Sequence, residues 1–227
     1  MINICVLIPL YNGIEFIDEC IVSLNNQKYQ NFDVLIGING HKKNSDVFIK
    51  ANEYKKQNII VKEYFYNKNN DKYVNYKSLT LNKMLKDCDN YDYICLLDID
   101  DIWLPNKLKM QVEIIEKYNN YYDVIGSKCH YIGNKYLIPY TPIGDLSDHN
   151  FKDVNPIINS SCLIKKELCY WNEHEKLEDY DLWLKLNNNG AKMYNLDEVL
   201  ILHRLHETSF FNSKIDSNEK DKIIKKY

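Results

Sequence analysis

The stretch Leu96-Leu97-Asp98-Ile99-Asp100-Asp101-Ile102-Trp103-Leu104-Pro105 decides the fold of this chain. An apolar run from Tyr93 to Leu97 has the composition of a buried strand, and it ends abruptly in three carboxylates within four residues. Buried strands of α/β sheets present their ligands just beyond their carboxyl ends. Crowded aspartates repel one another there, and a hard cation with phosphate oxygens would offset that repulsion. The alternative is a solvated acidic turn that caps a helix starting near Pro105, which is the favoured interpretation for Asp101 alone.

The composition limits the classes of protein to which the chain can belong. Its 227 residues, 45% of them hydrophobic, can bury one substantial core or two fused half-cores. A formal net charge of −3 indicates no general attraction to nucleic acid. The seven cysteines include no CxxC pair, which favours reduced thiols in a cytosol-like compartment, and Cys5 and Cys95 are expected to be buried in strands. No stretch reaches membrane-spanning length and residues 1–9 lack a basic start, so we expect a cytoplasmic protein, soluble or peripheral to a membrane.

The first hundred residues alternate between strand and helix patterns. Continuous apolar runs predict the strands, and apolar residues at helical spacing predict the helices. Such alternation implies crossover connections and a mainly parallel sheet. The expected strands are 4–9, 32–38, 59–66 and 93–97, the expected helices are 15–26, 46–57 and 77–88, and 67–75 is expected to be a loop.

The pattern is less regular after Asp101. The long segment 133–156 is poorly patterned, and the final twenty residues are polar and Lys-rich, which predicts a loosely attached helix or a tail. We expect helices at 105–118 and 180–189, a short helix ending at 168–171, strands at 124–132 and 160–164, and two further short strands within 192–205.

Five short motifs follow one another in the chain. In this order they resemble the motifs of family 2 glycosyltransferases of the GT-A fold, and the resemblance covers roughly residues 3–209. Each motif is weakly specific alone, whereas five in order are strong. They are Val6-Leu7-Ile8-Pro9-Leu10-Tyr11-Asn12 with Ser23-Leu24 and Gln27, Lys77-Ser78-Leu79-Thr80-Leu81-Asn82, the acidic Leu97–Pro105, Glu178-Asp179-Tyr180-Asp181-Leu182-Trp183, and His203-Arg204-Leu205-His206.

The resemblance implies a fold, a reaction and a set of partners. The fold would be a single α/β, GT-A-like domain over 1–227, with a Rossmann-type, mostly parallel sheet and helices on both faces. Residues 1–101 would form the nucleotide-sugar-binding half, 102–205 a smaller acceptor and catalytic half, and 206–227 a polar tail. The reaction would be inverting transfer from a nucleotide sugar, with Mn²⁺ or Mg²⁺ as cofactor. The acceptor, a saccharide or a lipid-linked or protein acceptor, is left open, and contact with a membrane surface is allowed.

The resemblance assigns the metal site to the acidic turn. Asp100 would bind the ion directly, while Asp98 would hold the ribose or a metal-bound water. Sites of the Mg²⁺ type need only one or two carboxylates when substrate oxygens complete the shell. His206 would complete the coordination or contact the diphosphate, with a surface histidine as the alternative. Arg204 is the only arginine, so either a bidentate phosphate contact or a structural ion pair with a nearby carboxylate explains its use.

The nucleotide is expected at the carboxyl ends of the first two strands, near Pro9, Tyr11, Asn12 and Asn39. Tyr11 would stack on the base, and Lys77 would approach the phosphates or remain solvated at a helix start. The family's usual Asp-Asp-Gly-Ser is replaced here by Ile38-Asn39-Gly40-His41. Because an amide can both accept and donate, a UDP-sugar is expected while GDP and dTDP sugars stay open.

Asp179 is the predicted general base. It precedes an amphipathic helix expected from Tyr180, whose N-terminal amides would keep the carboxylate ionised at neutral pH. The alternatives are an ordinary N-cap role for Asp179 and Glu178 as the base. For the acceptor, Trp103 and Trp183 would stack on sugars or pack in the core, and 133–155 would form a lid that orders on donor binding.

Three other functions compete with a transferase. A haloacid-dehalogenase-type phosphohydrolase would use Asp98 as its nucleophile, but Asp98 follows about ninety residues of sheet and helix, and the Thr or Val usual in that motif is missing. A catalytically inactive nucleotide-binding domain fits the altered Asn39 but not the intact acidic residues. A glycosidase needs two carboxylates flanking the bond and no metal site.

Overall fold

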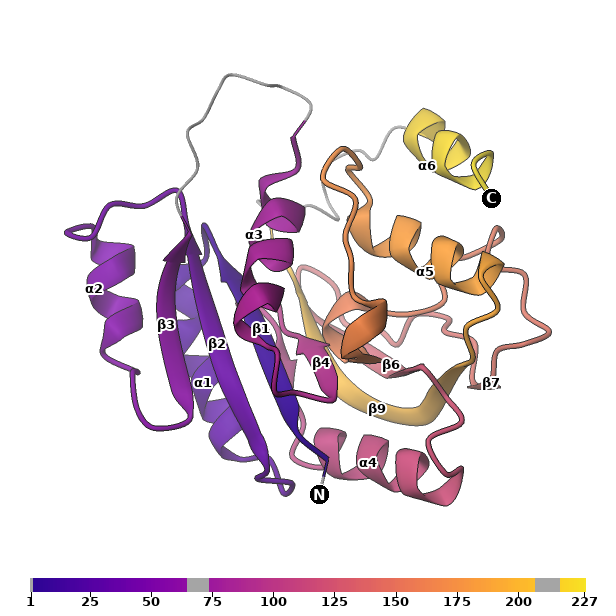
Figure 1. Ribbon diagram of the computed structural model, residues 1–227, viewed down its shortest axis with the longest axis horizontal. Coiled ribbons are helices and arrows are strands. Elements are labelled where there is room, and N and C mark those ends of the chain that lie inside the picture. Colours follow the sequence, from indigo (N-terminus) through magenta and orange to yellow (C-terminus); the bar gives the residue numbers. More distant parts are fainter. Residues whose placement is uncertain (1, 65–73, 207–216) are drawn as a thin grey trace.

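A computed structural model describes residues 2–64, 74–206 and 217–227. The strands form a mixed sheet in the order β3-β2-β1-β4-β8-β6-β9-β5, and β7 also pairs with β9 (Figure 1). The first four strands in the chain are parallel to one another: β1 Ile4–Leu10, β2 Phe32–Asn39, β3 Ile59–Tyr64 and β4 Tyr93–Leu96. The remaining strands are β5 Ile102–Trp103, β6 Val124–Gly133, β7 Gly144–Asp145, β8 Leu163–Lys165 and β9 Met193–Leu205. β8 is antiparallel to both β4 and β6, whereas β6 and β9 are parallel.

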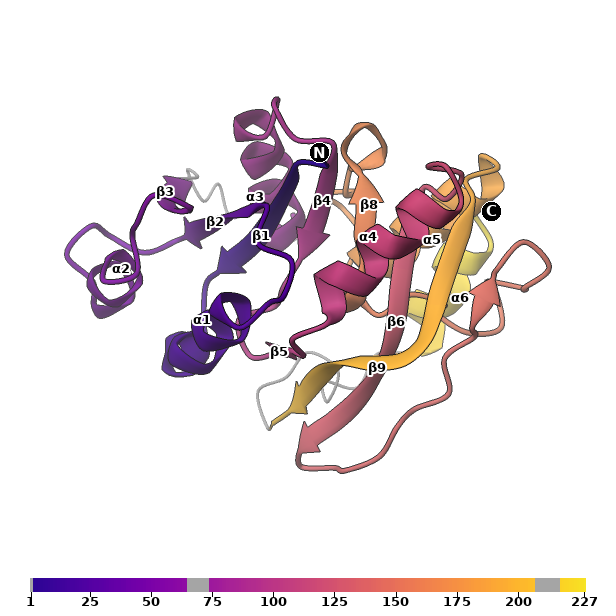
Figure 2. The same ribbon diagram turned by 90° about the horizontal axis from the view of Figure 1, so that it is seen from below.

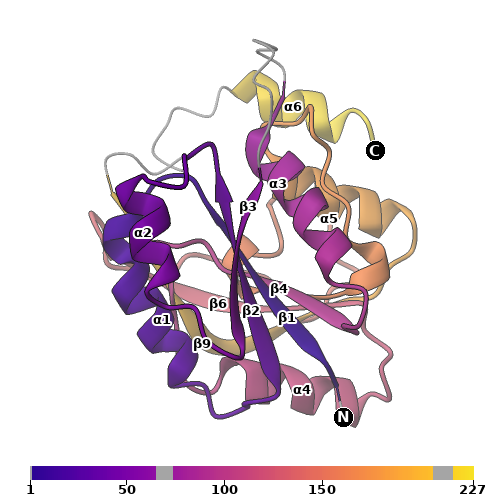
Figure 3. The ribbon, with the colours of Figure 1, turned by 60° about the vertical axis from the view of Figure 1, so that its left-hand side comes forward.

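Helices cover both faces of the sheet (Figure 3). One face carries α1 Ile17–Asn25, α2 Asp46–Asn52 and α4 Lys107–Lys117, and the other carries α3 Tyr76–Met84, α5 Glu178–Asn188 and α6 Ser217–Ile224. Side chains alternate across a strand, so β1 sends Ile4, Val6 and Ile8 into the first layer and Cys5 and Leu7 into the second. Short 3₁₀ helices complete the chain: η1 Ile14–Phe16, η2 Leu85–Asp87, η3 Asn159–Ser161 and η4 Lys166–Leu168.

The predicted alternation of strands and helices is confirmed, with differences at the edges. α2 ends at Asn52, five residues before the predicted end, and the short helix expected to end at 168–171 is η4. Residues 65–73, which hold the end of the third predicted strand and most of the predicted loop, lie outside the described residues. Within the described residues no helix is both long and apolar enough to cross a bilayer.

The prediction of two short strands within 192–205 is wrong. β9 is one strand of 13 residues that bends along β6 (Figure 2). Ser127 pairs with Leu196 and Lys128 with Val199, so Asp197 and Glu198 of β9 are left out of the pairing and form an exposed bulge instead of a turn. A bulge bends a strand without ending it, which is why polar residues in mid-strand looked like a break.

The topology brings distant segments to one edge of the sheet. Leu7 of β1 lies beside Leu96 of β4, so the residues after both strands emerge together. Because β8 is antiparallel to β4, the segment before β8, which is η3, lies at the same edge as the residues after β4. β9 also ends there, since the backbone of Arg204 donates to the side chain of Asp101 at 3.0 Å.

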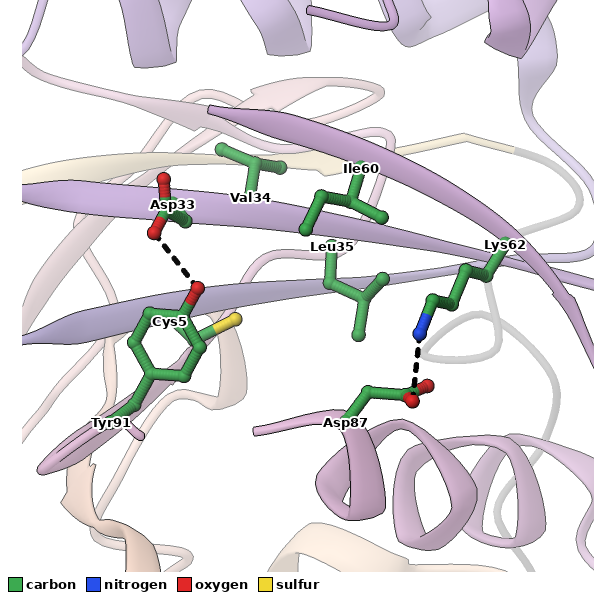
Figure 4. A pocket seen from close by; sticks show the side chains of 8 residues that line it. All are labelled: Cys5, Asp33, Val34, Leu35, Ile60, Lys62, Asp87 and Tyr91. Carbon is green, nitrogen blue, oxygen red and sulfur yellow. Dashed lines mark hydrogen bonds and ion pairs between the residues drawn. The ribbon is translucent and has the colours of Figure 1, made fainter. Parts of the chain in front are cut away.

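A small hollow lies elsewhere, on the α3 side of the sheet (Figure 4). It is closed by a hydrogen bond from Tyr91 to Asp33 of 2.8 Å and by an ion pair between Lys62 and Asp87 of 2.7 Å. Its volume of about 20 Å³ holds no more than one water molecule. It is therefore a packing feature and not a substrate site.

Candidate active site

One cleft of about 1250 Å³ opens at the carboxyl edge of the sheet. Its walls come from β1, β2, α3, the acidic turn after β4, the start of α5 and the end of β9. All the site residues predicted from the sequence line it: Pro9, Tyr11, Asn12, Asn39, Lys77, Asp98, Asp100, Asp179, Arg204 and His206. The structure therefore brings together side chains that are almost two hundred residues apart in the chain.

Asp101 is fully buried and fastens the acidic turn to β9. Its carboxylate accepts hydrogen bonds from the backbone of Arg204 at 3.0 Å and from Nδ1 of His203 at 2.9 Å. Burial would lower the pKa of His203, but the charge of Asp101 outweighs it and raises that pKa to about 9. The expectation that Asp101 caps a helix in solvent is wrong, because its partners lie on β9 and it is not exposed.

Asp98 is turned toward α3 and η3. Its Oδ1 pairs with Nζ of Lys77 at 2.8 Å, and its Oδ2 accepts from the amide of Asn159 at 3.2 Å. Its backbone N–H donates to Oγ of Ser160 at 3.1 Å. Burial would raise the pKa of Asp98, but Lys77 and Asn159 outweigh burial and hold that pKa below its usual value. Asp98 is thus an ionised carboxylate that already has a cationic partner.

Asp100 faces His206 across the cleft corner. Its Oδ2 lies 2.9 Å from Nε2 of His206. Burial, followed by the charges of Asp101 and Asp98, raises the pKa of Asp100. The described residues contain no cluster of three or more His, Cys, Asp or Glu that would hold a metal by itself. A carboxylate and an imidazole at this spacing, in a field of negative charge, fit a divalent ion whose other ligands are substrate oxygens and water.

Arg204 braces the acidic turn. Its Nε donates to the backbone oxygen of Asp100 at 3.0 Å, and its Nη2 pairs with Glu19 at 2.7 Å. The guanidinium also lies over the ring of Phe16, 4.9 Å from its centre. The sequence allowed two explanations for Arg204, and these contacts are those of a structural ion pair with a carboxylate. Contact of Arg204 with a phosphate stays a prediction.

The nucleotide end of the cleft combines an amide with an exposed ring. Asn39 is buried and its amide nitrogen donates to the backbone oxygen of Tyr76 at 3.4 Å, which leaves its side-chain oxygen as an acceptor. The ring of Tyr11 is 48% exposed and lies 5.5 Å from the ring of His41. Pro9 and Asn12, at the end of β1, complete this end of the cleft.

Asn75 and Lys77 join the start of α3 to the start of α5. The side chain of Asn75 caps α3 by accepting from Lys77 and Ser78, and its amide donates to Glu178 at 3.1 Å. Nζ of Lys77 pairs with Glu178 at 3.3 Å as well as with Asp98. Burial would lower the pKa of Lys77, but Asp98 and Glu178 outweigh it and raise that pKa. Lys77 is therefore a bridge across the cleft and not a solvated residue at a helix start.

Asp179 lies in the first turn of α5, which begins at Glu178 and so two residues before the predicted start. Its side chain is half-buried, lines the cleft and accepts from the amide of Asn155 at 3.1 Å. Burial, followed by the charge of Glu178, raises the pKa of Asp179 to about 6, against the opposing effect of Lys77. The N-terminal amides of the helix therefore do not outweigh burial and the charge of Glu178. With a pKa of about 6, Asp179 is still mostly ionised at neutral pH.

Several residues of the site are missing from the sequence-based set. They are Asn75, Asn155, Asn159 and Ser160, which hold the predicted residues in place by hydrogen bonds. Asn75 could have been found, because an Asn before an amphipathic stretch is a common N-cap. Asn155 and η3 carry no such signal, since only the placement of β8 antiparallel to β4 brings η3 to the acidic turn, and Asn155 meets Asp179 through a long-range contact.

Comparisons with known proteins identify the family of the chain. Residues 5–164 match the family model for glycosyl transferase family 2. The chain belongs to glycosyltransferase family 2. This membership confirms the sequence-based recognition, and the phosphohydrolase with Asp98 as nucleophile loses its support.

Relatives and solved structures extend the likeness. The chain is 27% identical to an uncharacterized glycosyltransferase of Rickettsia conorii, covering 97% of this chain but 37% of that protein. It is 26% identical to the amylovoran biosynthesis glycosyltransferase AmsB of Erwinia amylovora, covering 88% of this chain and 68% of AmsB. Staphylococcus aureus TarS 1-349 in complex with UDP shares the fold with a TM-score of 0.66 at 16% identity, over 98% of this chain and 70% of that one.

A second solved structure, the mannosyltransferase PcManGT from Pyrobaculum calidifontis in complex with GDP-Man and Mn²⁺, has a TM-score of 0.65 at 13% identity. It covers 91% of this chain and 58% of that chain. Together with TarS it confirms the predicted GT-A fold, a mostly parallel curled sheet with helices on both faces. Trp103 and Trp183 are buried in this fold, so they pack in the core and do not stack on a substrate.

Proposed function

We propose that this glycosyltransferase transfers a sugar from a nucleoside-diphosphate sugar, a UDP-sugar by preference, to an acceptor hydroxyl with inversion. The observation that carries the proposal is the cleft, which presents the acidic turn and Asp179 to the same space. Nucleotide binding at the carboxyl ends of parallel strands is the rule in α/β sheets. The solved relatives hold UDP or GDP-Man, which supports a nucleotide-sugar donor here.

The preference for uracil rests on Asn39 and Tyr11. The amide of Asn39 donates to Tyr76, so its oxygen is oriented to accept the N3–H of a uracil ring. The exposed ring of Tyr11 offers a face on which the base stacks. A guanine presents a different edge to an acceptor, and this is the physical basis for expecting UDP to bind more tightly than GDP.

Asp100 and His206 would hold the divalent ion, Mn²⁺ or Mg²⁺, as their adjacent oxygen and nitrogen ligands indicate. When bound, the ion supplies Lewis-acid stabilisation of the departing diphosphate. The Mn²⁺ of the mannosyltransferase relative supports this assignment. Asp98 would serve the ribose or a metal-bound water while Lys77 keeps it ionised. Arg204 would hold the turn in position and meet the donor phosphate from the same corner.

Asp179 would act as the general base. Its carboxylate takes the proton of the acceptor hydroxyl as the oxygen forms its bond to the anomeric carbon. The bond from that carbon to the phosphate oxygen breaks, and its electron pair leaves with the diphosphate. Attack opposite the leaving group inverts the configuration. Asp179 suits this role better than Glu178, because Glu178 is buried and already bound by Lys77 and Asn75.

Two measurements test the proposal. Thermal unfolding with UDP, GDP or inorganic phosphate, with and without Mn²⁺, should show the largest rise in midpoint with UDP and Mn²⁺ together. A screen of nucleotide sugars by mass spectrometry should then identify one donor that is consumed. Stabilisation by phosphate and Mg²⁺ without any nucleotide would contradict the proposed reaction, and stronger stabilisation by GDP would contradict the uracil preference.

A further inference from the structure

Exposed apolar side chains are concentrated in one segment of the protein. Eleven large apolar side chains are exposed among the described residues, and five of them lie within residues 136–143. The other six are scattered singly over the surface, as in most soluble proteins. A contiguous exposed apolar surface marks an interaction site. The five, which define the rim segment 136–143, are Tyr136, Leu137, Ile138, Tyr140 and Ile143.

The rim segment is held in place by its backbone. The backbone oxygen of Leu137 accepts from Tyr131 of β6 at 2.8 Å, and that of Pro142 accepts from the buried amide of Asn195 at 2.8 Å. Pro139 and Pro142 restrict the backbone further. The connection from β6 to β7 runs along the periphery of the molecule (Figure 2). The outward display of apolar side chains is therefore a fixed feature of the fold.

The rim segment follows one edge of the active-site cleft. Its residues 139–141 line the cleft directly. At one end the last residues of β6 pair with Arg204 and Leu205, beside the proposed metal corner. At the other end, the side-chain amide of Asn195 donates to the backbone oxygens of both Pro142 and Pro156. Pro156 follows Asn155, and Asn155 donates a hydrogen bond to Asp179. The rim segment therefore borders the cleft through residues 139–141, and its two ends are anchored near the proposed metal corner and near the residue that contacts Asp179.

The chemistry of the segment fits a lipid surface with negative charge. Residues 129–144 contain no Asp or Glu and carry His130 and Lys135, whereas Lys128 just before them is paired with Asp197. Tyrosine, leucine and isoleucine beside lysine are typical of residues that enter the interface of a bilayer. Three of the five side chains are aliphatic, and a saccharide would require hydrogen-bonding groups that aliphatic side chains lack.

We propose that the rim segment 136–143 docks on an anionic membrane surface and so presents the cleft to an acceptor carried by a lipid. This rests on the proposed function, because it gives that same cleft its class of acceptor. The aliphatic and aromatic side chains enter the interface, and the basic side chains approach the anionic headgroups. The cleft edge then faces the membrane, and a hydroxyl near the headgroup reaches Asp179.

The test is co-sedimentation of the whole protein with vesicles that contain phosphatidylglycerol, and with vesicles of phosphatidylcholine alone. The variant Tyr136→Ser/Leu137→Ser/Ile138→Ser changes no residue that lines the cleft. The control Val22→Ser/Ile49→Ser/Tyr121→Ser removes equally exposed side chains elsewhere. Wild type and control should bind the anionic vesicles, and the rim variant should bind at least about tenfold more weakly.

Two results would overturn the proposal. The first is that the wild-type protein does not co-sediment with anionic vesicles, or that the rim variant binds them as tightly as the wild type does. The other is wild-type protein that dimerises in sedimentation velocity while the rim variant does not, which would make the segment a contact between copies. The stabilisation by UDP and Mn²⁺ should be equal in all three proteins, so a failure of membrane docking is distinguishable from a failure of donor binding.

Discussion

The acidic turn and the start of α5 each carry a pair of adjacent carboxylates, and the two pairs divide their tasks in the same way. Asp101 and Glu178 are buried and hold structure, the first through His203 and β9, the second through Lys77 and Asn75. Their neighbours, Asp100 and Asp179, are less buried and line the cleft, where Glu178 is also present but held by its partners. In both pairs burial and an adjacent carboxylate raise the pKa of the cleft-facing residue.

The two pairs differ in the group that contacts the cleft-facing carboxylate, Asp100 in one pair and Asp179 in the other. Asp100 lies 2.9 Å from an imidazole nitrogen of His206, the residue proposed as a second metal ligand. Asp179 accepts a hydrogen bond from a neutral amide at 3.1 Å, and burial and the charge of Glu178 raise its pKa, which favours acceptance of a proton. A carboxylate beside a second ligand suits a cation, and a carboxylate beside an amide suits proton transfer. The surroundings of Asp100 and Asp179 thus differ in the way that their proposed roles require.

Lys77 makes the two regions one site. It pairs with Asp98 on the acidic turn and with Glu178 on α5, so the two regions share one cation. The pair with Asp98 lies at the carboxyl end of β4, and the pair with Glu178 fixes the first turn of the helix that carries Asp179. A change of Lys77 itself is therefore expected to affect both regions.

The largest effect is expected from Asp179→Asn. The amide cannot take the acceptor proton, so turnover should fall by about 10² to 10⁴. Stabilisation by UDP and Mn²⁺ should persist, because the nucleotide contacts remain. Turnover is measured with the donor that the screen identifies, and Asp197→Asn, an exposed acid outside the cleft, serves as control. Near-normal turnover in Asp179→Asn would place the base elsewhere.

Asp100→Ala should remove the metal dependence of donor binding. A ligand at one hundred times its dissociation constant stabilises a protein by about 2.7 kcal/mol, and this is the gain that should disappear. The measurement is the unfolding midpoint with UDP at several Mn²⁺ concentrations. UDP without metal should still stabilise weakly through Asn39 and Tyr11. A Mn²⁺-dependent gain equal to that of wild type would exclude Asp100 as a ligand.

The sequence predicted the residues at the ends of parallel strands well, for a physical reason. Apolar runs mark buried strands, and parallel strands have their carboxyl ends at one edge of the sheet. The strand pattern alone therefore predicts that Pro9, Asn39 and Asp98 lie at the same edge. For the same reason the predicted fold class is correct, since alternating strand and helix patterns leave few other topologies.

The supporting residues could not be predicted, because they depend on long-range placement. β8 has only three residues, and nothing in them indicates that they lie antiparallel to β4 and deliver Asn159 and Ser160 to Asp98. The direction of the Asp101 side chain depends on where β9 ends, and the bulge at Asp197 hid the length of that strand. A one-dimensional pattern reports which side chains are buried, not which partners they find.

The pH dependence of turnover should separate the two acids of α5. Because Asp179 must be ionised and its pKa is about 6, turnover should fall as the pH drops through about 6. Glu178→Gln removes a charge that raises this pKa, so the acid limb of the turnover profile should move to lower pH. A profile of turnover against pH for both proteins checks this. An acid limb that does not move would show that Glu178 is not electrostatically coupled to the base.

The smallest effect is expected from Asn159→Ala, which tests whether η3 positions Asp98. One hydrogen bond is lost while the pair with Lys77 remains, so the cost should be about 1 kcal/mol, or about a fivefold weaker affinity for UDP with Mn²⁺. Ser160→Ala removes the bond to the backbone of Asp98 instead and should act in the same direction. Both affinities are measured by titration calorimetry. The acid limb set by Asp179 should stay in place in both variants, since the hydrogen bonds that they remove are made to Asp98 and not to α5. A shifted limb would mean that Lys77 transmits changes at Asp98 to the base, and the two regions would then be one electrostatic unit.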